Sequence, residues 1–146
     1  MSLQNKKILV CAEYFEPDIG GAQEIAKRIA LTQKKNNQVH ILTTFHPERS
    51  KYNDNFKINH FKVTGNYVNG LKGEVKKVLV FLKKNKFDIV IFYAAQQWTF
   101  DIFLLNESLL NTKSRFFLIP CGFSKLKFPN YYFYFNKIMK FSKKFE

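Results

Sequence analysis

A pair of adjacent glycines near the amino terminus is the feature of the sequence best suited to holding an anion. Gly20 and Gly21 end a polar loop, and Ala22 and Gln23 open a segment with helical periodicity. A glycine-rich helix start lets backbone N–H groups approach a ligand closely, with the positive end of the helix dipole behind them. The pair therefore predicts a phosphate or diphosphate site, and a role in turn geometry alone is the alternative. The loop is too long to form the dinucleotide fingerprint G-x-G-x-x-G.

Polar and aromatic side chains in the same loop and in two later segments could bind a ligand rich in hydroxyl groups. These candidates are Tyr14, Glu16, Asp18, Gln96, Gln97, Trp98 and Gly122. Carboxylates and amides hydrogen-bond hydroxyl groups, and an indole ring can stack on a sugar ring. Simpler roles are open for several of them. Glu13, Glu16 and Asp18 are equally well explained as solvated loop residues, and the favoured interpretation of Trp98 is the first core residue of a helix.

The cysteines and histidines do not form a metal-binding pattern. Cys11 and Cys121 lie far apart and outside any C-x-x-C spacing, so we expect both to be reduced and in or near the core. We expect His40, His46 and His60 to be surface or packing residues, because no metal spacing joins them. A catalytic role for Cys121 has little support, since no base lies near it in the sequence. We therefore expect neither a metal nor a cofactor.

The elements that must position these residues follow from hydrophobic periodicity. Apolar runs predict strands at 8–12, 38–44, 56–63, 87–93 and 115–119, with a loop at 47–55 and a turn at 65–70. Apolar residues at helical spacing predict helices over 22–37, 71–82, 98–109 and 129–146. Alternating strands and helices predict one Rossmann-like α/β domain over 1–146, a mostly parallel sheet between helices. Ligands of such sheets bind beyond the carboxyl ends of the strands, which selects 13–23, 94–99 and 121–125.

The charge of the chain bears on its partners and its location. The net charge is +13, and the arginines are only Arg28, Arg49 and Arg115. Because base recognition depends on arginine, we expect no nucleic-acid partner, whereas compositional drift and an anionic lipid surface both explain the lysines. The aromatic and basic tail, 128–144, suits a lipid interface, a core-facing helix, or a face covered by another domain. Without a signal peptide or a spanning segment, we expect a cytoplasmic protein, peripheral at the inner membrane face.

The string KILVCAEYFEPDIGGAQEIAKRIA resembles the opening of glycosyltransferase family 4 and its relatives of the GT-B type. Their motif has the form F-x-P-x-x-G-G-[AV]-[EQ], and the matching residues here are Phe15, Pro17, Gly20, Gly21, Ala22 and Gln23. The order of elements is similar along the whole chain, including the strand start Phe87-Asp88-Ile89-Val90. The resemblance implies one half of a two-domain enzyme. This half binds the acceptor, through the polar candidates named above, and holds its Gly-Gly loop near the donor diphosphate.

The chain also departs from that family. No donor-binding domain follows, so the resemblance implies that a separate C-terminal domain or subunit holds the nucleotide-sugar and that this chain is inactive alone. Cys121 stands where relatives usually have a histidine, and a thiol is a weaker hydrogen-bond donor. The implied activity is a metal-independent, retaining transfer from a nucleotide-sugar to a saccharide or lipid-linked acceptor. The alternative is a non-catalytic module that binds a glycan, a membrane or a protein partner.

Overall fold

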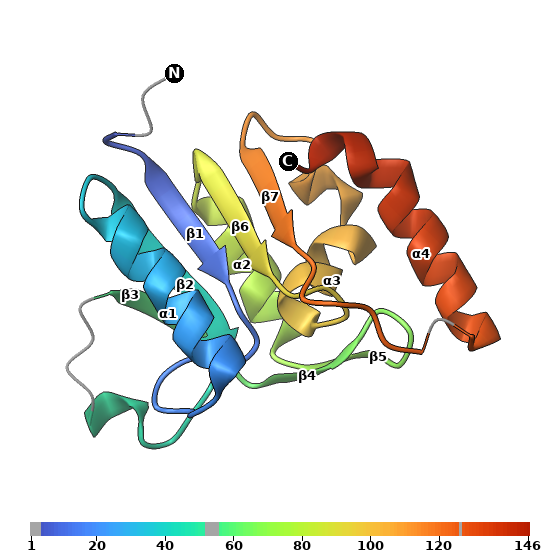
Figure 1. The fold of residues 1–146 in the computed structure, drawn as a ribbon, viewed down its shortest axis with the longest axis horizontal. Helices are drawn as coiled ribbons and strands as arrows, with labels where there is room; N and C mark the ends of the chain where they lie inside the picture. The colour runs from blue at the N-terminus through green and yellow to red at the C-terminus, as the bar shows by residue number, and fades with distance from the viewer. Residues whose placement is uncertain (1–3, 52–55, 126) are drawn as a thin grey trace.

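A five-stranded parallel sheet forms the centre of the protein in the computed structural model, which describes residues 4–51, 56–125 and 127–146. The strand order is β3-β2-β1-β6-β7 (Figure 1). The strands are β1 (Lys7–Cys11), β2 (Gln38–Thr44), β3 (Lys57–Phe61), β6 (Ile89–Tyr93) and β7 (Arg115–Ile119). Every neighbouring pair is parallel, so the carboxyl ends of the strands lie at one edge. The predicted α/β, Rossmann-like fold is confirmed.

Helices cover both faces of this sheet. They are α1 (Gly21–Lys34), α2 (Val75–Lys84), α3 (Trp98–Leu105) and α4 (Pro129–Phe141). In β1, Ile8 and Val10 belong to the same buried cluster as Ala26 of α1, whereas Leu9 belongs to the cluster of α2 and α3. Because successive strand residues face opposite sides, the unbroken apolar run of β1 fills both cores at once.

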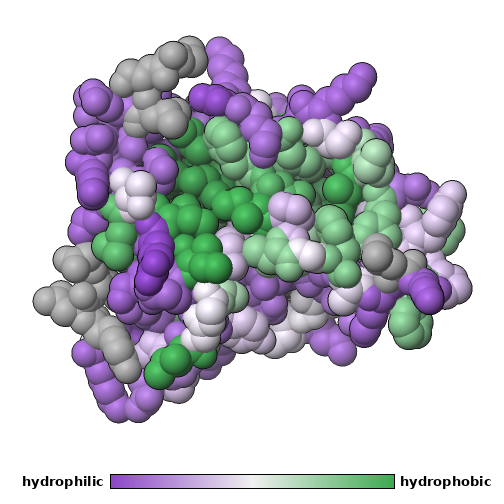
Figure 2. Space-filling view, viewed as in Figure 1, coloured by the Kyte–Doolittle hydropathy of each residue, from purple (hydrophilic) through white to green (hydrophobic). Residues whose placement is uncertain are grey.

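The near face of the sheet is only partly covered. Figure 1 shows α1 over one half of this face and no helix over β6 and β7, where Figure 2 shows apolar side chains gathered. Ile119 at the end of β7 and Ile25 of α1 are both exposed large apolar residues. This side of the domain therefore leaves apolar surface open to solvent.

A small antiparallel hairpin, β4 (Val63–Asn66) paired with β5 (Gly70–Gly73), precedes α2. The sequence prediction was wrong here: the third strand ends at Phe61 instead of Val63, and Leu71 lies in β5 instead of a helix. Gly65 and Gly73 have φ values of 93° and 94°. Glycine is needed at both positions, since an added Cβ would also lie 2.0 Å from a backbone carbonyl oxygen.

One predicted helix is shorter than its apolar spacing indicated. The helix expected to reach Leu109 ends at Leu105, whose side chain is exposed, and Leu109 lies in a separate 3-10 turn, Glu107–Leu109.

In the loop expected at 47–55, a 3-10 turn spans Arg49–Lys51, and positions 52–55 lie outside the described residues.

The end of the chain returns to the sheet instead of continuing the predicted helix. After α4 and a 3-10 turn at Ser142–Lys144, Phe145 forms a parallel bridge to Phe116 of β7. Glu146 N donates to Phe116 O at 2.9 Å, and the Glu146 carboxylate binds Arg115 Nη2 at 2.6 Å. Helix α4 therefore connects β7 to a segment that runs beside it in the same direction.

The hairpin glycines give a test of this backbone geometry. Gly65→Ala should lower the free energy of unfolding by about 3 kcal/mol, because the Cβ meets the Gly70 carbonyl and the backbone must shift. Gly70→Ala is the matched control, since it has φ of 76° but open space around the added Cβ. It should cost about 1 kcal/mol. Urea denaturation measures both, and equal losses would contradict the close approach.

Candidate functional site

The candidate site lies at the carboxyl edge of the sheet, where the chain changes its direction of winding. Strand β1 leads into α1 on the near face, and its neighbour β6 leads into α3 on the opposite face (Figure 1). The loops after these two strands therefore separate from each other. In open α/β sheets such a topological switch point is where ligands bind.

Glu13 lies at this edge directly after β1, and both its backbone and its carboxyl group are notable. Its N–H donates to Gln97 Oε1 at 3.1 Å, and its carbonyl accepts from Thr44 N at 3.0 Å and Thr43 Oγ1 at 3.1 Å. The backbone of Glu13 thus joins the ends of β1 and β2 to the loop after β6. Burial raises the pKa of the half-buried Glu13 carboxyl to about 7. The same carboxyl raises the pKa of exposed Tyr14.

A second carboxyl group, Asp101 in α3, lies fully buried behind this edge. Asp101 Oδ2 accepts from Tyr67 N at 2.8 Å, and Asp101 Oδ1 accepts from Tyr134 Oη at 2.9 Å. Tyr134 Oη in turn accepts from Gln96 N at 2.6 Å. Burial, with a smaller contribution from the charge of Glu13, raises the pKa of Asp101 to about 7. The bonds connect α3 to the hairpin, to α4 and to the loop after β6.

Gln96 positions two loops instead of presenting its amide to solvent. Its Nε2 donates to Ser124 O at 2.9 Å, and its Oε1 accepts from Ser124 N at 2.7 Å. Gln96 and Ala94 have φ values of 59° and 71°, which turn the chain sharply after β6. The predicted ligand-binding amide of Gln96 is therefore already used to hold the loop after β7 against the loop after β6.

The neighbouring residues have different roles from one another. Gln97 uses Oε1 to accept from Glu13 N, and among the described residues none bonds its Nε2, which leaves that donor for a ligand. Trp98 is fully buried, and its Nε1 donates to Thr44 Oγ1 at 2.7 Å. The interpretation of Trp98 as a core residue is confirmed, and its ring is not accessible for stacking on a sugar.

The paired glycines lie at the start of α1, which is near the carboxyl end of β1 (Figure 1). Gly20 is the extended N-cap residue, and no side-chain hydrogen bond from the described residues caps the helix. The first turn contains Gly21, Ala22 and Gln23, and Glu24 N donates to Gly20 O at 3.0 Å. The N–H groups of this turn are therefore open to an anion. An added Cβ at Gly20 would lie 2.5 Å from Oε1 of the flexible Gln23 side chain, which can move aside.

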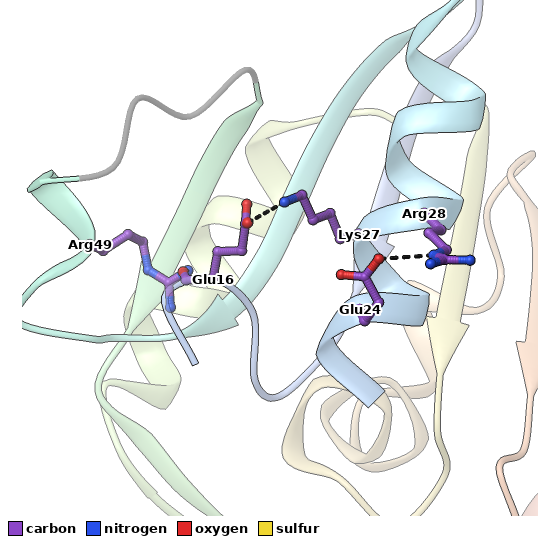
Figure 3. Close-up of polar contacts among 5 residues, drawn as sticks. All are labelled: Glu16, Glu24, Lys27, Arg28 and Arg49. Carbon is purple, nitrogen blue, oxygen red and sulfur yellow. Dashed lines mark hydrogen bonds and ion pairs between the residues drawn. The ribbon is translucent and has the colours of Figure 1, made fainter. Parts of the chain in front are cut away.

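Two predicted ligand-binding carboxylates in the loop before α1 already have protein partners. Glu16 pairs with Lys27 Nζ of α1 at 2.5 Å, and its carbonyl accepts from buried Arg49 Nη1 (Figure 3). Asp18 Oδ1 lies 3.9 Å from His46 Nε2. These contacts hold the loop in position. Of the three loop carboxyl groups, Glu16 thus has a lysine partner and Asp18 lies near a histidine, whereas Glu13 forms no ion pair among the described residues.

Cys121 and Gly122 follow β7 at the same edge and are both exposed. The expectation that both cysteines lie in or near the core is correct for buried Cys11 and wrong for Cys121, because the chain leaves the sheet before it. The Cys121 thiol donates to Ile119 O at 3.4 Å. Contact with this thiol raises the pKa of Tyr93 to about 12. Cys121 therefore lies at the carboxyl edge of the sheet and is open to solvent.

The histidines are packing residues or partners of loop groups. His40 is buried in β2 with its ring 5.3 Å from that of Phe87, and burial lowers its pKa to about 4. The ring of His60 lies 5.2 Å from that of Phe45. Within 4–51, 56–125 and 127–146, no group of histidine, cysteine, aspartate and glutamate side chains is arranged to hold a metal ion.

Asp101 and the carboxyl group of Glu13 are not among the ligand-binding residues that the sequence predicts. Asp101 is a single acidic residue in the otherwise apolar segment WTFDIFLL, and an acid at such a position indicates a buried, hydrogen-bonded group. In the sequence Glu13 resembles the other acids of the loop, Glu16 and Asp18. Its distinguishing signal is its place directly after the first strand.

Comparison with known proteins assigns no family to the chain. No protein-family model matches it, and a search of the curated proteins found no match. Among the described residues, no helix has the length and apolar character needed to cross a membrane.

The buried carboxyl of Asp101 predicts a pH dependence of stability. Its pKa rises from about 3.9 in the unfolded chain to about 7 when folded, so its stabilising effect is complete below pH ~4 and is lost as the pH rises towards 7. Between pH 5 and 7.5, the free energy of unfolding should fall by about 2 kcal/mol less in Asp101→Asn than in the wild type, as measured by thermal unfolding. Tyr134→Phe is the control, because it lowers stability but keeps the titrating carboxyl. Parallel curves for wild type and D101N would contradict the prediction.

Proposed function

We propose that this chain is the acceptor-side domain of a glycosyltransferase that moves a sugar from a nucleotide-sugar to a saccharide or lipid-linked acceptor. The observation that carries the proposal is the uncapped, glycine-led start of α1 at the carboxyl edge of the sheet. An anionic diphosphate fits this position, because bare N–H groups and the helix dipole both favour negative charge. The resemblance of residues 15–23 to the family 4 motif supports the same assignment.

The residues at the switch point have the chemistry that an acceptor site requires. Glu13 offers a carboxyl oxygen to an acceptor hydroxyl, and Gln97 Nε2 offers a donor beside it. Because the pKa of Glu13 is about 7, the group exchanges a proton readily near neutral pH. The amides of Gly21 and the following residues stabilise the departing diphosphate as its charge develops. A second domain or subunit supplies the nucleotide pocket, and the transfer needs no metal or cofactor.

A substitution that removes one N–H group tests the diphosphate site. Proline is favoured at the first helical position and lacks the N–H, so Gly21→Pro keeps the helix start but deletes a donor. Its neighbour Gly20 is extended, as a residue before proline should be. Binding of pyrophosphate, measured by calorimetry, should weaken about tenfold in Gly21→Pro.

Gly21→Ala is the matched control for this experiment. It keeps the N–H, and an added Cβ has no heavy atom within 4 Å. Pyrophosphate binding should therefore equal that of the wild type. Equal affinities for the proline and alanine variants, or no pyrophosphate binding by the wild type, would exclude the site. Sugar transfer by the isolated chain would contradict its role as half of an enzyme.

A second candidate function, membrane association, is favoured by the outer face of α4. The helix buries one apolar face, yet four further apolar side chains around it are 60–71% exposed: Phe128, Tyr132, Phe133 and Met139. Lys143 and Lys144 follow the helix and have no carboxylate partner among the described residues. Exposed aromatic rings beside lysines are typical of surfaces that bind anionic bilayers.

Co-sedimentation with vesicles tests this second function. Tyr132→Ser/Phe133→Ser should reduce binding to vesicles rich in phosphatidylserine about tenfold, because two interfacial rings are lost. Val80→Ser, which removes an exposed apolar residue from α2, should bind as the wild type does. Higher salt should weaken the binding of all three proteins. Binding that is independent of the ring substitutions would show that α4 is not the contact.

A further inference from the structure

A cavity of about 860 Å³ lies at the amino edge of the sheet, opposite the candidate site. It is bordered by the end of α2, the turn after α3, and the starts of β6 and β7. Its size is in the range of sites for small molecules, roughly 300–1,000 Å³. Its apolar walls include Leu82, Phe87, Val90, Phe103, Leu109 and Phe116.

Polar groups in the cavity walls already form hydrogen bonds within the protein. Ser114 Oγ donates to Phe87 O at 2.7 Å, and Thr112 Oγ1 donates to Ser114 Oγ at 3.0 Å. Asp88 Oδ2 accepts from Lys7 N at 2.8 Å. A nucleotide or sugar would lose hydrogen bonds to water without gaining partners here. The interior therefore suits an apolar group.

The mouth of the cavity is strongly cationic. Four lysines contribute to it, Lys6, Lys83, Lys86 and Lys113, and among the described residues no carboxylate pairs with their ammonium groups. Arg115 also lines the cavity but is held by the Glu146 carboxylate. Asp88 is the only acidic residue of the lining, and its carboxylate caps the Lys7 N–H. The lysines are thus free to bind an anion outside the apolar walls.

From this combination we propose that the cavity binds a single-chain anionic amphiphile, with the chain against the apolar walls and the anionic head among the lysines. The two parts of the ligand match the two parts of the site. A neutral apolar molecule would leave the lysine charges uncompensated, and a polar anion would leave the walls unfilled. A carboxylate and a phosphate head satisfy the same lysines, so the headgroup is defined by its charge. The site does not depend on the proposed transferase function.

Fluorescence of cis-parinaric acid, titrated into the full chain below its micelle concentration, tests the proposal. We expect saturable binding with one molecule per chain. The methyl ester of the same acid, which keeps the chain but lacks the charge, should bind at least tenfold more weakly. Displacement of the probe by dodecanoate or by dodecyl phosphate then distinguishes a carboxylate ligand from a phosphate ligand. Absence of saturation, or equal binding of acid and ester, would overturn the proposal.

Variants at the mouth and the wall locate the ligand. Ser108 is an exposed residue of the lining, and Ser108→Trp should block the cavity and reduce probe binding at least tenfold while the circular dichroism spectrum is unchanged. Lys83→Glu/Lys113→Glu should reduce binding by a similar factor. Lys72→Glu/Lys57→Glu, which changes the net charge equally but lies outside the lining, is the matched control and should bind like the wild type. Undiminished binding to folded Ser108→Trp, or equal losses in both charge variants, would place the ligand elsewhere.

Discussion

The buried carboxyl group of Asp101 is the constraint on which the arrangement of the carboxyl edge depends. A carboxyl group without access to water must be hydrogen-bonded or neutral, and Asp101 meets the first condition through Tyr67 N and Tyr134 Oη. These partners belong to the hairpin and to α4, far from α3 in the sequence. Because Tyr134 also accepts from Gln96 N, one buried group fixes the positions of two elements and of the loop that flanks the switch point.

The hydrogen bonds of Asp101 and Tyr134 also determine how the exposed loops of the carboxyl edge are arranged. Gln96 holds the loop after β7 through Ser124, and Gln97 reaches across to the backbone of Glu13. The polar groups of this edge therefore fall into two sets: those that hold other loops in place, and those that form no such bond and can contact a ligand. The remaining groups are the Glu13 carboxyl, the Gln97 Nε2 donor and the amides at the start of α1, a set with one proton-exchanging group and several hydrogen-bond donors.

Sequence periodicity predicted the sheet and its helices well because both depend on local patterns. The run at β1 and the spacing of Ala26 and Ala30 in α1 are visible in any short window. The hairpin was not predicted, since it depends on close backbone contacts at Gly65 and Gly73 that only the folded chain reveals. For the same reason the sequence could nominate Gln96 as a polar residue near the edge, but not its bonds to Ser124.

The two edges of the sheet differ in a way that bears on the net charge of +13. At the carboxyl edge, Glu16 neutralises Lys27, and no side-chain hydrogen bond from the described residues caps the start of α1. At the amino edge the lysines have no such partners and surround an apolar cavity. Uniform compositional drift would add lysines to both edges without regard to their neighbours. A cationic mouth over apolar walls concentrates charge where an anionic head would lie.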